Sequence, residues 1–223
     1  CDDGEYVFDV IFSPKQAWTN YQRQPDMCNR DTAQEFIKLC YQPYYERFGA
    51  EFGKTVPYVF SDEIKIMWLE HETFWDDDVI AATYWTSDYE NIFEDKHGYR
   101  ISDRLPELFY RFPERLYSQV SFDHVSTMTE LFRENFVRPV SEWCEQRNIG
   151  LTGHLHLSGF DTSILCGSPM SALYYFSMPG VDTLTDCVHK YSAIKQAASV
   201  ANQFSKKRVL CEIYGCTGWD WPL

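Results

Sequence analysis

The chain has 223 residues, of which 44% are hydrophobic, and this is enough to bury the core of one domain of ordinary size. Its formal net charge of −13 argues against binding to nucleic acid or to anionic membrane surfaces, because the field of the whole protein repels both. The sequence also lacks an apolar run long enough to span a membrane.

The first part of the chain predicts a helix, a strand and a long irregular segment. Apolar residues recur at spacings of three and four over 31–48, and Gly49 follows as a C-terminal cap, which predicts an amphipathic helix. Residues 55–60 read as a buried strand that ends at Ser61-Asp62-Glu63. Periodicity weakens over 64–105, where acidic residues and Trp concentrate, so we expect an irregular functional segment there.

The second part repeats the alternation of helix and strand. A long helix is predicted over 121–147, with Pro139 kinking or splitting it. Ser168-Pro169 resembles a helix start. The remaining predicted elements are strands at 150–157, 179–184 and 208–214 and a helix at 187–204.

This alternation predicts an α/β fold with parallel strands. Four strand-helix steps make about half of a (β/α)8 TIM-type barrel, so we expect 1–223 to be a single catalytic barrel domain or a fragment of one. The alternative is an open doubly wound sheet, but its usual phosphate-binding fingerprints, GxGxxG and GxxxxGK[ST], do not occur in the sequence.

The eight cysteines form no CxxC pair, which argues against a zinc ribbon or a thioredoxin-type redox site. We expect reduced thiols and a cytoplasmic protein. Secretion is the alternative, because the first residues do not resemble a natural start and the chain reads as an excerpt of a longer polypeptide with further domains.

Two acidic residues each end an apolar strand, Glu63 in FSDE and Glu212 in VLCEIYG. A barrel brings the carboxyl ends of its strands together at one mouth, so these side chains are expected to face each other although they are far apart in the sequence. Two carboxyl groups are what the acid-base cleavage of a glycoside requires. Glu63 and Glu212 are therefore the predicted catalytic pair.

Other residues near these strand ends are predicted to bind a sugar substrate. Asp62 can accept hydrogen bonds from hydroxyl groups or tune its neighbour, although a local strand-end cap is an equally good explanation. His154 and His156 share one strand face and are interpreted as polar pocket residues rather than as a zinc site, because no third ligand follows at a set spacing. Aromatic residues that stack on sugar rings complete the predicted set, namely Trp68, Trp85, Tyr214 and Trp219.

No cofactor is expected from the residues themselves. The acidic run at 70–78 offers oxygen ligands for calcium, yet it lacks the DxDxDG order of a calcium loop, and a solvated acidic loop explains it better.

Several collinear motifs resemble a known family. The strings are YYERFGAEFGKTVPYVFSDE, HGY with LPELF, PVSEWCEQRNIGLTGHLHL, MPGVDTL and CEIYGCTGWDW. They are similar to large bacterial α-L-rhamnosidase-like glycoside hydrolases near glycoside hydrolase family 106. The resemblance spans most of the chain and implies a catalytic (β/α)8 barrel, with β-sandwich domains elsewhere in the polypeptide. It also implies that Glu63 and Glu212 are the carboxylates, that His154 lines the pocket, and that calcium is a conceivable cofactor without a matched ligand set here.

The hypothesis from the sequence is hydrolysis of terminal O-glycosidic bonds in oligosaccharides or glycoconjugates, with Glu63 as the general acid and Glu212 as the nucleophile or base. The two roles can also be exchanged. Two alternatives remain: a carbohydrate-binding barrel without catalysis, and a metal-dependent hydrolase centred on His154 and His156.

Overall fold

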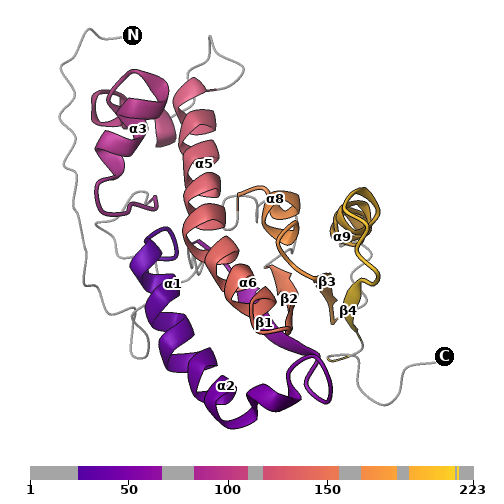
Figure 1. The fold of residues 1–223 in the computed structure, drawn as a ribbon. Coiled ribbons are helices and arrows are strands. Elements are labelled where there is room, and N and C mark those ends of the chain that lie inside the picture. Colours follow the sequence, from indigo (N-terminus) through magenta and orange to yellow (C-terminus); the bar gives the residue numbers. More distant parts are fainter. Residues whose placement is uncertain are drawn as a thin grey trace, which may run out of the picture. The chain divides into compact units, whose positions relative to one another are not determined.

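The computed structural model describes residues 25–66, 83–109, 118–155, 167–184, 191–213 and 215 (Figure 1). The chain divides into two compact units. Of the described residues, the larger unit holds 26–66 and those from Val125 onward, and the smaller unit holds Pro25 and those between 83 and 124.

The larger unit is built on a four-stranded sheet in which every pair of neighbours is parallel. Its strands follow the order of the sequence: β1 (Tyr58–Ile64), β2 (Gly150–Leu155), β3 (Met178–Thr183) and β4 (Leu210–Ile213). The prediction of an α/β fold with parallel strands is confirmed, and all four predicted strands are present.

The helix predicted over 31–48 is present as three consecutive helical segments. They are α1 (Arg30–Phe36), a π-helical turn (Ile37–Tyr41) and α2 (Gln42–Phe48), and a 3₁₀ turn (Gly49–Glu51) follows them. The Asn29 side chain caps α1 by accepting a hydrogen bond from the backbone N–H of Asp31. Pro43 is the second residue of α2.

The long helix predicted over 121–147 has the same construction. It comprises α5 (Gln119–Phe132), a π-helical turn (Arg133–Val137) and α6 (Arg138–Glu145). Pro139 lies in the first turn of α6. Because proline has no backbone N–H, it cannot donate the hydrogen bond that a continuous α-helix would need at this position. The expected interruption at Pro139 therefore takes the form of a π turn just before it.

Two further helices pack on the sheet, α8 (Pro169–Leu173) and α9 (Tyr191–Gln203). Alanines at intervals of four, Ala193, Ala197 and Ala201, are buried along α9, which contacts β3. Small side chains let the helix lie close to the strand. Among the described residues, no helix combines the length and the apolar content needed to cross a membrane.

The smaller unit contains α3 (Tyr89–His97), a 3₁₀ turn (Ile101–Arg104) and α4 (Pro106–Phe109). The prediction of an irregular segment over 64–105 is wrong for this part. Only Tyr89 and Phe93 of α3 are buried, and this single pair four residues apart is too short a pattern to indicate a helix in the sequence.

Strands β1 and β2 approach each other closely at Gly153, which pairs with Ser61. The backbone of Gly153 has a φ of +129°, and a Cβ atom there would lie 1.9 Å from the carbonyl oxygen of Ser61. Only glycine fits this position, because both the backbone angle and the space exclude a side chain.

We therefore expect Gly153→Ala to lower the free energy of unfolding by about 2 to 4 kcal/mol, from the clash and the unfavourable φ together. Gly98→Ala is the matched control, because Gly98 also has a positive φ but has nothing near its missing Cβ. The control should cost only about 1 kcal/mol. Equal losses in chemical denaturation would contradict the close approach of the two strands.

A buried histidine organises the smaller unit. The ring of His124 lies 2.6 Å from the Tyr89 hydroxyl at Nδ1 and 2.8 Å from the Thr83 hydroxyl at Nε2. Burial lowers the pKa of His124 from 6.5 to about 4, because the charged imidazolium would lose its hydration. His124 is therefore neutral in the folded protein at neutral pH.

This depressed pKa makes the folded state less stable in acid. His124 contributes its full stability above pH 6.5, and the contribution falls as the pH drops toward 4, because the unfolded chain binds the proton first. The total loss should reach about 3 kcal/mol. Chemical denaturation of the parent chain and of His124→Gln between pH 7.5 and 4.5 measures the effect. The parent should lose more stability than the variant, and parallel pH curves would contradict the prediction.

Candidate active site

Three polar side chains from three strands converge on one face of the sheet in the larger unit. Nε2 of His154 on β2 lies 3.0 Å from Oε2 of Glu212 on β4 and 3.4 Å from Oδ1 of Asp62 on β1. Each residue lies in the carboxyl-terminal half of its strand. This is the end of a parallel sheet at which binding sites form in α/β proteins.

The convergence requires a strongly curved sheet. Strands β1 and β4 are separated by β2 and β3, so in a flat sheet they would lie roughly 14 Å apart. The facing oxygens of Asp62 and Glu212 nevertheless lie within 4.8 Å of each other. The face that carries Asp62, His154 and Glu212 is therefore concave.

His154 is the fixed member of the group. Its side chain is only 1% exposed, and its ring makes an edge contact with Phe60, with 5.5 Å between the ring centroids. Nε2 lies within hydrogen-bond distance of Oε2 of Glu212, and a carboxylate at that position would accept the bond from an Nε2–H group. Among the described residues, no group bonds to the buried Nδ1 atom.

The two carboxylates are far more open than the histidine. The side chain of Asp62 is 74% exposed and that of Glu212 is 40% exposed. The buried ring nitrogen thus lies beside two carboxylate oxygens that an incoming ligand can still reach.

Glu63 has different surroundings from Asp62. Its Oε2 lies 3.9 Å from Nζ of Lys65, and the Lys65 side chain is only 3% exposed. The pairing of β1 with β2 is irregular between Ser61 and Ile64, and Glu63 has a φ of +40°. A positive φ is uncommon for a residue with a side chain and costs about 1 to 3 kcal/mol.

Substitution of Glu63 tests this backbone conformation. At an ordinary position Gly is less stable than Ala by about 0.5 to 1 kcal/mol, because it loses more conformational freedom on folding. At a positive φ the order reverses, so Glu63→Gly should be more stable than Glu63→Ala by about 1 kcal/mol. Thermal or chemical unfolding of both variants measures the difference. A less stable Gly variant would show that no left-handed backbone exists at Glu63.

The structure therefore brings together three of the predicted site residues, Asp62, His154 and Glu212. Trp85 lies in the smaller unit, where its ring makes an edge contact with Tyr89 at 4.8 Å. The other predicted residues, Trp68, His156, Tyr214 and Trp219, lie outside the described residues.

Two further residues at these strand ends were not predicted from the sequence as site residues. Lys65 is one of them, because a lysine just after a strand reads as solvent-exposed. Asp182 is the other: it pairs with Glu212 in the register of β3 and β4, and its carboxylate accepts a hydrogen bond from the backbone N–H of Leu184. The signal for Asp182 was available, because it ends the apolar run of β3 just as Glu212 ends that of β4.

The same three residues could hold a cation. Asp62, His154 and Glu212 each offer one ligand atom, and these atoms all lie within 4.8 Å of one another. A nitrogen with two carboxylate oxygens suits zinc or a similar transition metal. Calcium takes six to eight oxygens and fits this set poorly.

Comparison with known proteins gives a match in fold. A scan against models of protein families finds none that fits this chain, and a search of curated proteins also finds no match. Among solved structures, the chain is similar to a rhamnosidase from Novosphingobium sp. PP1Y, with a TM-score of 0.60 and 16% sequence identity. The match covers 85% of this chain but 17% of that chain, so this chain spans a small part of its length. At this identity the similarity supports the α/β architecture.

Proposed function

We propose that the chain carries the carboxylate site of a glycoside hydrolase and forms part of a (β/α)8 barrel. The convergence of carboxylates from β1 and β4 on the buried His154 is the observation that carries the proposal. A parallel sheet whose strands follow the sequence and curve around one concave face is what a barrel requires. The fold similarity to a rhamnosidase supports the same class of enzyme.

In this proposal the carboxyl groups of Glu212, Glu63 and Asp62 have different roles. Glu212 accepts the hydrogen bond from His154, which orients its ionised form as the nucleophile or base. Glu63 supplies the proton to the leaving oxygen. Asp62 is the most exposed of the three and accepts hydrogen bonds from sugar hydroxyl groups. The substrate is a terminal sugar of an oligosaccharide or glycoconjugate, with α-L-rhamnose the first candidate.

Charge-neutral substitutions test the assignment in the intact protein against a panel of aryl glycosides. Glu63→Gln and Glu212→Gln should each lower kcat by about 10² to 10⁴-fold, because each removes a group that transfers a proton or attacks the sugar. Asp62→Asn should mainly raise KM.

Glu94→Gln is the matched control, since Glu94 is an exposed residue of α3 and its loss should leave kcat unchanged. Full activity in Glu212→Gln would exclude the proposed chemistry. Sugar binding without any turnover in the parent protein would instead indicate a carbohydrate-binding barrel.

A second candidate function follows from the ligand set itself. A metal ion held by Asp62, His154 and Glu212 would supply Lewis-acid activation of water in a metal-dependent hydrolase. This candidate predicts about one equivalent of bound metal in elemental analysis. His154→Gln should lose that metal, while His97→Gln in the smaller unit should retain it. Metal-free protein with full glycosidase activity would exclude the metal-dependent hydrolase and would agree with the carboxylate glycoside hydrolase.

A further inference from the structure

A further carboxylate lies on the concave face of the sheet, beside Glu212. Asp182 of β3 pairs with Glu212 of β4 in the parallel register, and residues paired in this way point to the same face of a sheet. Neighbouring strands are only about 4.8 Å apart. The carboxyl groups of Asp182 and Glu212 are therefore close enough to contact one ligand.

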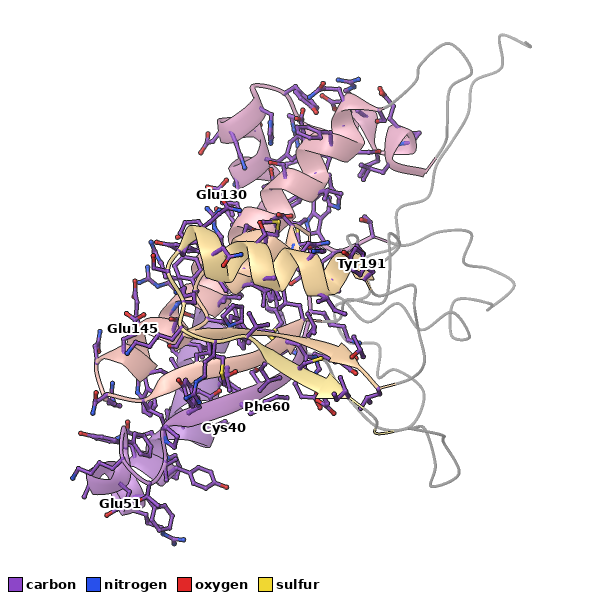
Figure 2. The ribbon with its side chains drawn as sticks, turned by 90° about the vertical axis from the view of Figure 1, so that its right-hand side faces the viewer. Cys40, Glu51, Phe60, Glu130, Glu145 and Tyr191 are labelled. Carbon is purple, nitrogen blue, oxygen red and sulfur yellow. The ribbon has the colours of Figure 1, made fainter. Side chains whose placement is uncertain are left out.

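The register of β2 with β3 places Asp182 on the same face. Thr152 of β2 pairs with Met178, which lies four residues before Asp182 on β3. Residues an even number apart along a strand share a face, so Asp182 lies on the face of Thr152. Phe60, which Figure 2 labels on β1, pairs with Thr152 and makes the edge contact with the His154 ring. Asp182 is thus on the face that carries the candidate site.

The two oxygens of Asp182 have different surroundings. Oδ1 accepts a hydrogen bond of 2.8 Å from the backbone N–H of Leu184, which fixes the orientation of the carboxylate. Among the described residues, no group bonds to Oδ2. The side chain is half-buried, whereas Val181 on the opposite face is fully buried. A carboxylate that is held at one oxygen and open at the other can accept a hydrogen bond from a ligand without first having to be ordered.

The charges on this face limit the class of ligand that it can accept. Asp62, Glu212 and Asp182 contribute three carboxylates, while the ammonium group of Lys65 is buried and lies near Glu63. Ionised carboxylates accept hydrogen bonds but do not donate them, so the ligand has to supply the donors. The hydroxyl groups of a neutral sugar do this. A sugar with its own carboxylate or sulfate would be repelled, because like charges brought together across an interface cost free energy.

We propose that Asp182 is a specificity-determining residue that binds one hydroxyl group of a neutral sugar through Oδ2. The inference rests on the proposed function, in which Asp62 and Glu212 contact the same sugar. Asp62 lies on β1 and Asp182 on β3, so the two aspartates meet different hydroxyl groups of one ring. Asp182 takes no part in bond cleavage and acts on affinity alone.

Asp182→Asn separates this role from a structural one, because the amide keeps an oxygen for the Leu184 N–H group and loses the charge at the other position. Calorimetry measures binding of neutral and acidic thioglycosides, which resist cleavage, to the intact protein. The tightest ligand of the parent should be neutral. Asp182→Asn should bind it about tenfold more weakly, which is the size of a hydrogen bond to a charged group. One monodeoxy derivative of that ligand, which lacks the recognised hydroxyl group, should bind equally to variant and parent.

Asp26→Asn is the matched control. Asp26 accepts the same kind of hydrogen bond, from the backbone N–H of Cys28 two residues on, but it precedes α1 and belongs to no strand. This variant should bind every ligand as the parent does.

The possible failures can be told apart. Unchanged affinity in Asp182→Asn, or the same weakening toward every monodeoxy derivative, would overturn the role of Asp182. The proposed function would survive that result if the parent still cleaves aryl glycosides. An acidic sugar as the tightest ligand, or equal weakening in Asp26→Asn, would also overturn the role of Asp182. A parent protein that neither binds nor cleaves any sugar would overturn both proposals together.

Discussion

The close contact of β1 and β2 at Gly153 determines where the side chains of the candidate site lie. The Ser61 carbonyl occupies the space that a side chain at Gly153 would need, so the two strands approach at the point where each begins to carry polar residues. His154 follows Gly153 directly and is buried against Phe60, and its Nε2 reaches Asp62 one residue beyond Ser61. A larger residue at 153 would separate the strands and also the imidazole from that carboxylate.

Curvature extends this contact across the sheet. A Cβ atom at Gly180 of β3 would lie 2.4 Å from the Gly153 carbonyl oxygen, so β2 and β3 also approach where side chains are missing. Glycines on neighbouring strands let the strand backbones approach closely and let a sheet bend. The bend brings Glu212 of β4 to the same nitrogen that meets Asp62 of β1, although two strands lie between them. The geometry of the candidate site thus depends on two glycines, Gly153 and Gly180, that contribute no side chain to it.

Much of this arrangement could be predicted from the sequence, and the reasons for the remainder are physical. Strong periodicity predicted the helices flanking the sheet, and apolar runs predicted all four strands. Strand-end logic predicted that Glu63 and Glu212 face each other, with Asp62 and His154 nearby. The structure instead brings Asp62, His154 and Glu212 together. Their mutual distances follow from sheet curvature, which no local pattern encodes. Buried Lys65 was missed for a similar reason, since its burial depends on packing around an irregular strand end. The short helix α3 was missed because it buries only two residues.

Asp62 and Glu63 are adjacent in the chain but have different partners, and the backbone between them explains how. In a regular strand, alternation would send neighbouring side chains to opposite faces of the sheet. Here the register is irregular after Ser61, and Glu63 adopts a left-handed conformation that costs free energy. Asp62 remains with the imidazole of His154, while Glu63 lies near the ammonium group of the buried Lys65. Two carboxyl groups with such different neighbours can take different parts in one reaction, because a donor imidazole and a buried ammonium group impose different constraints on proton transfer.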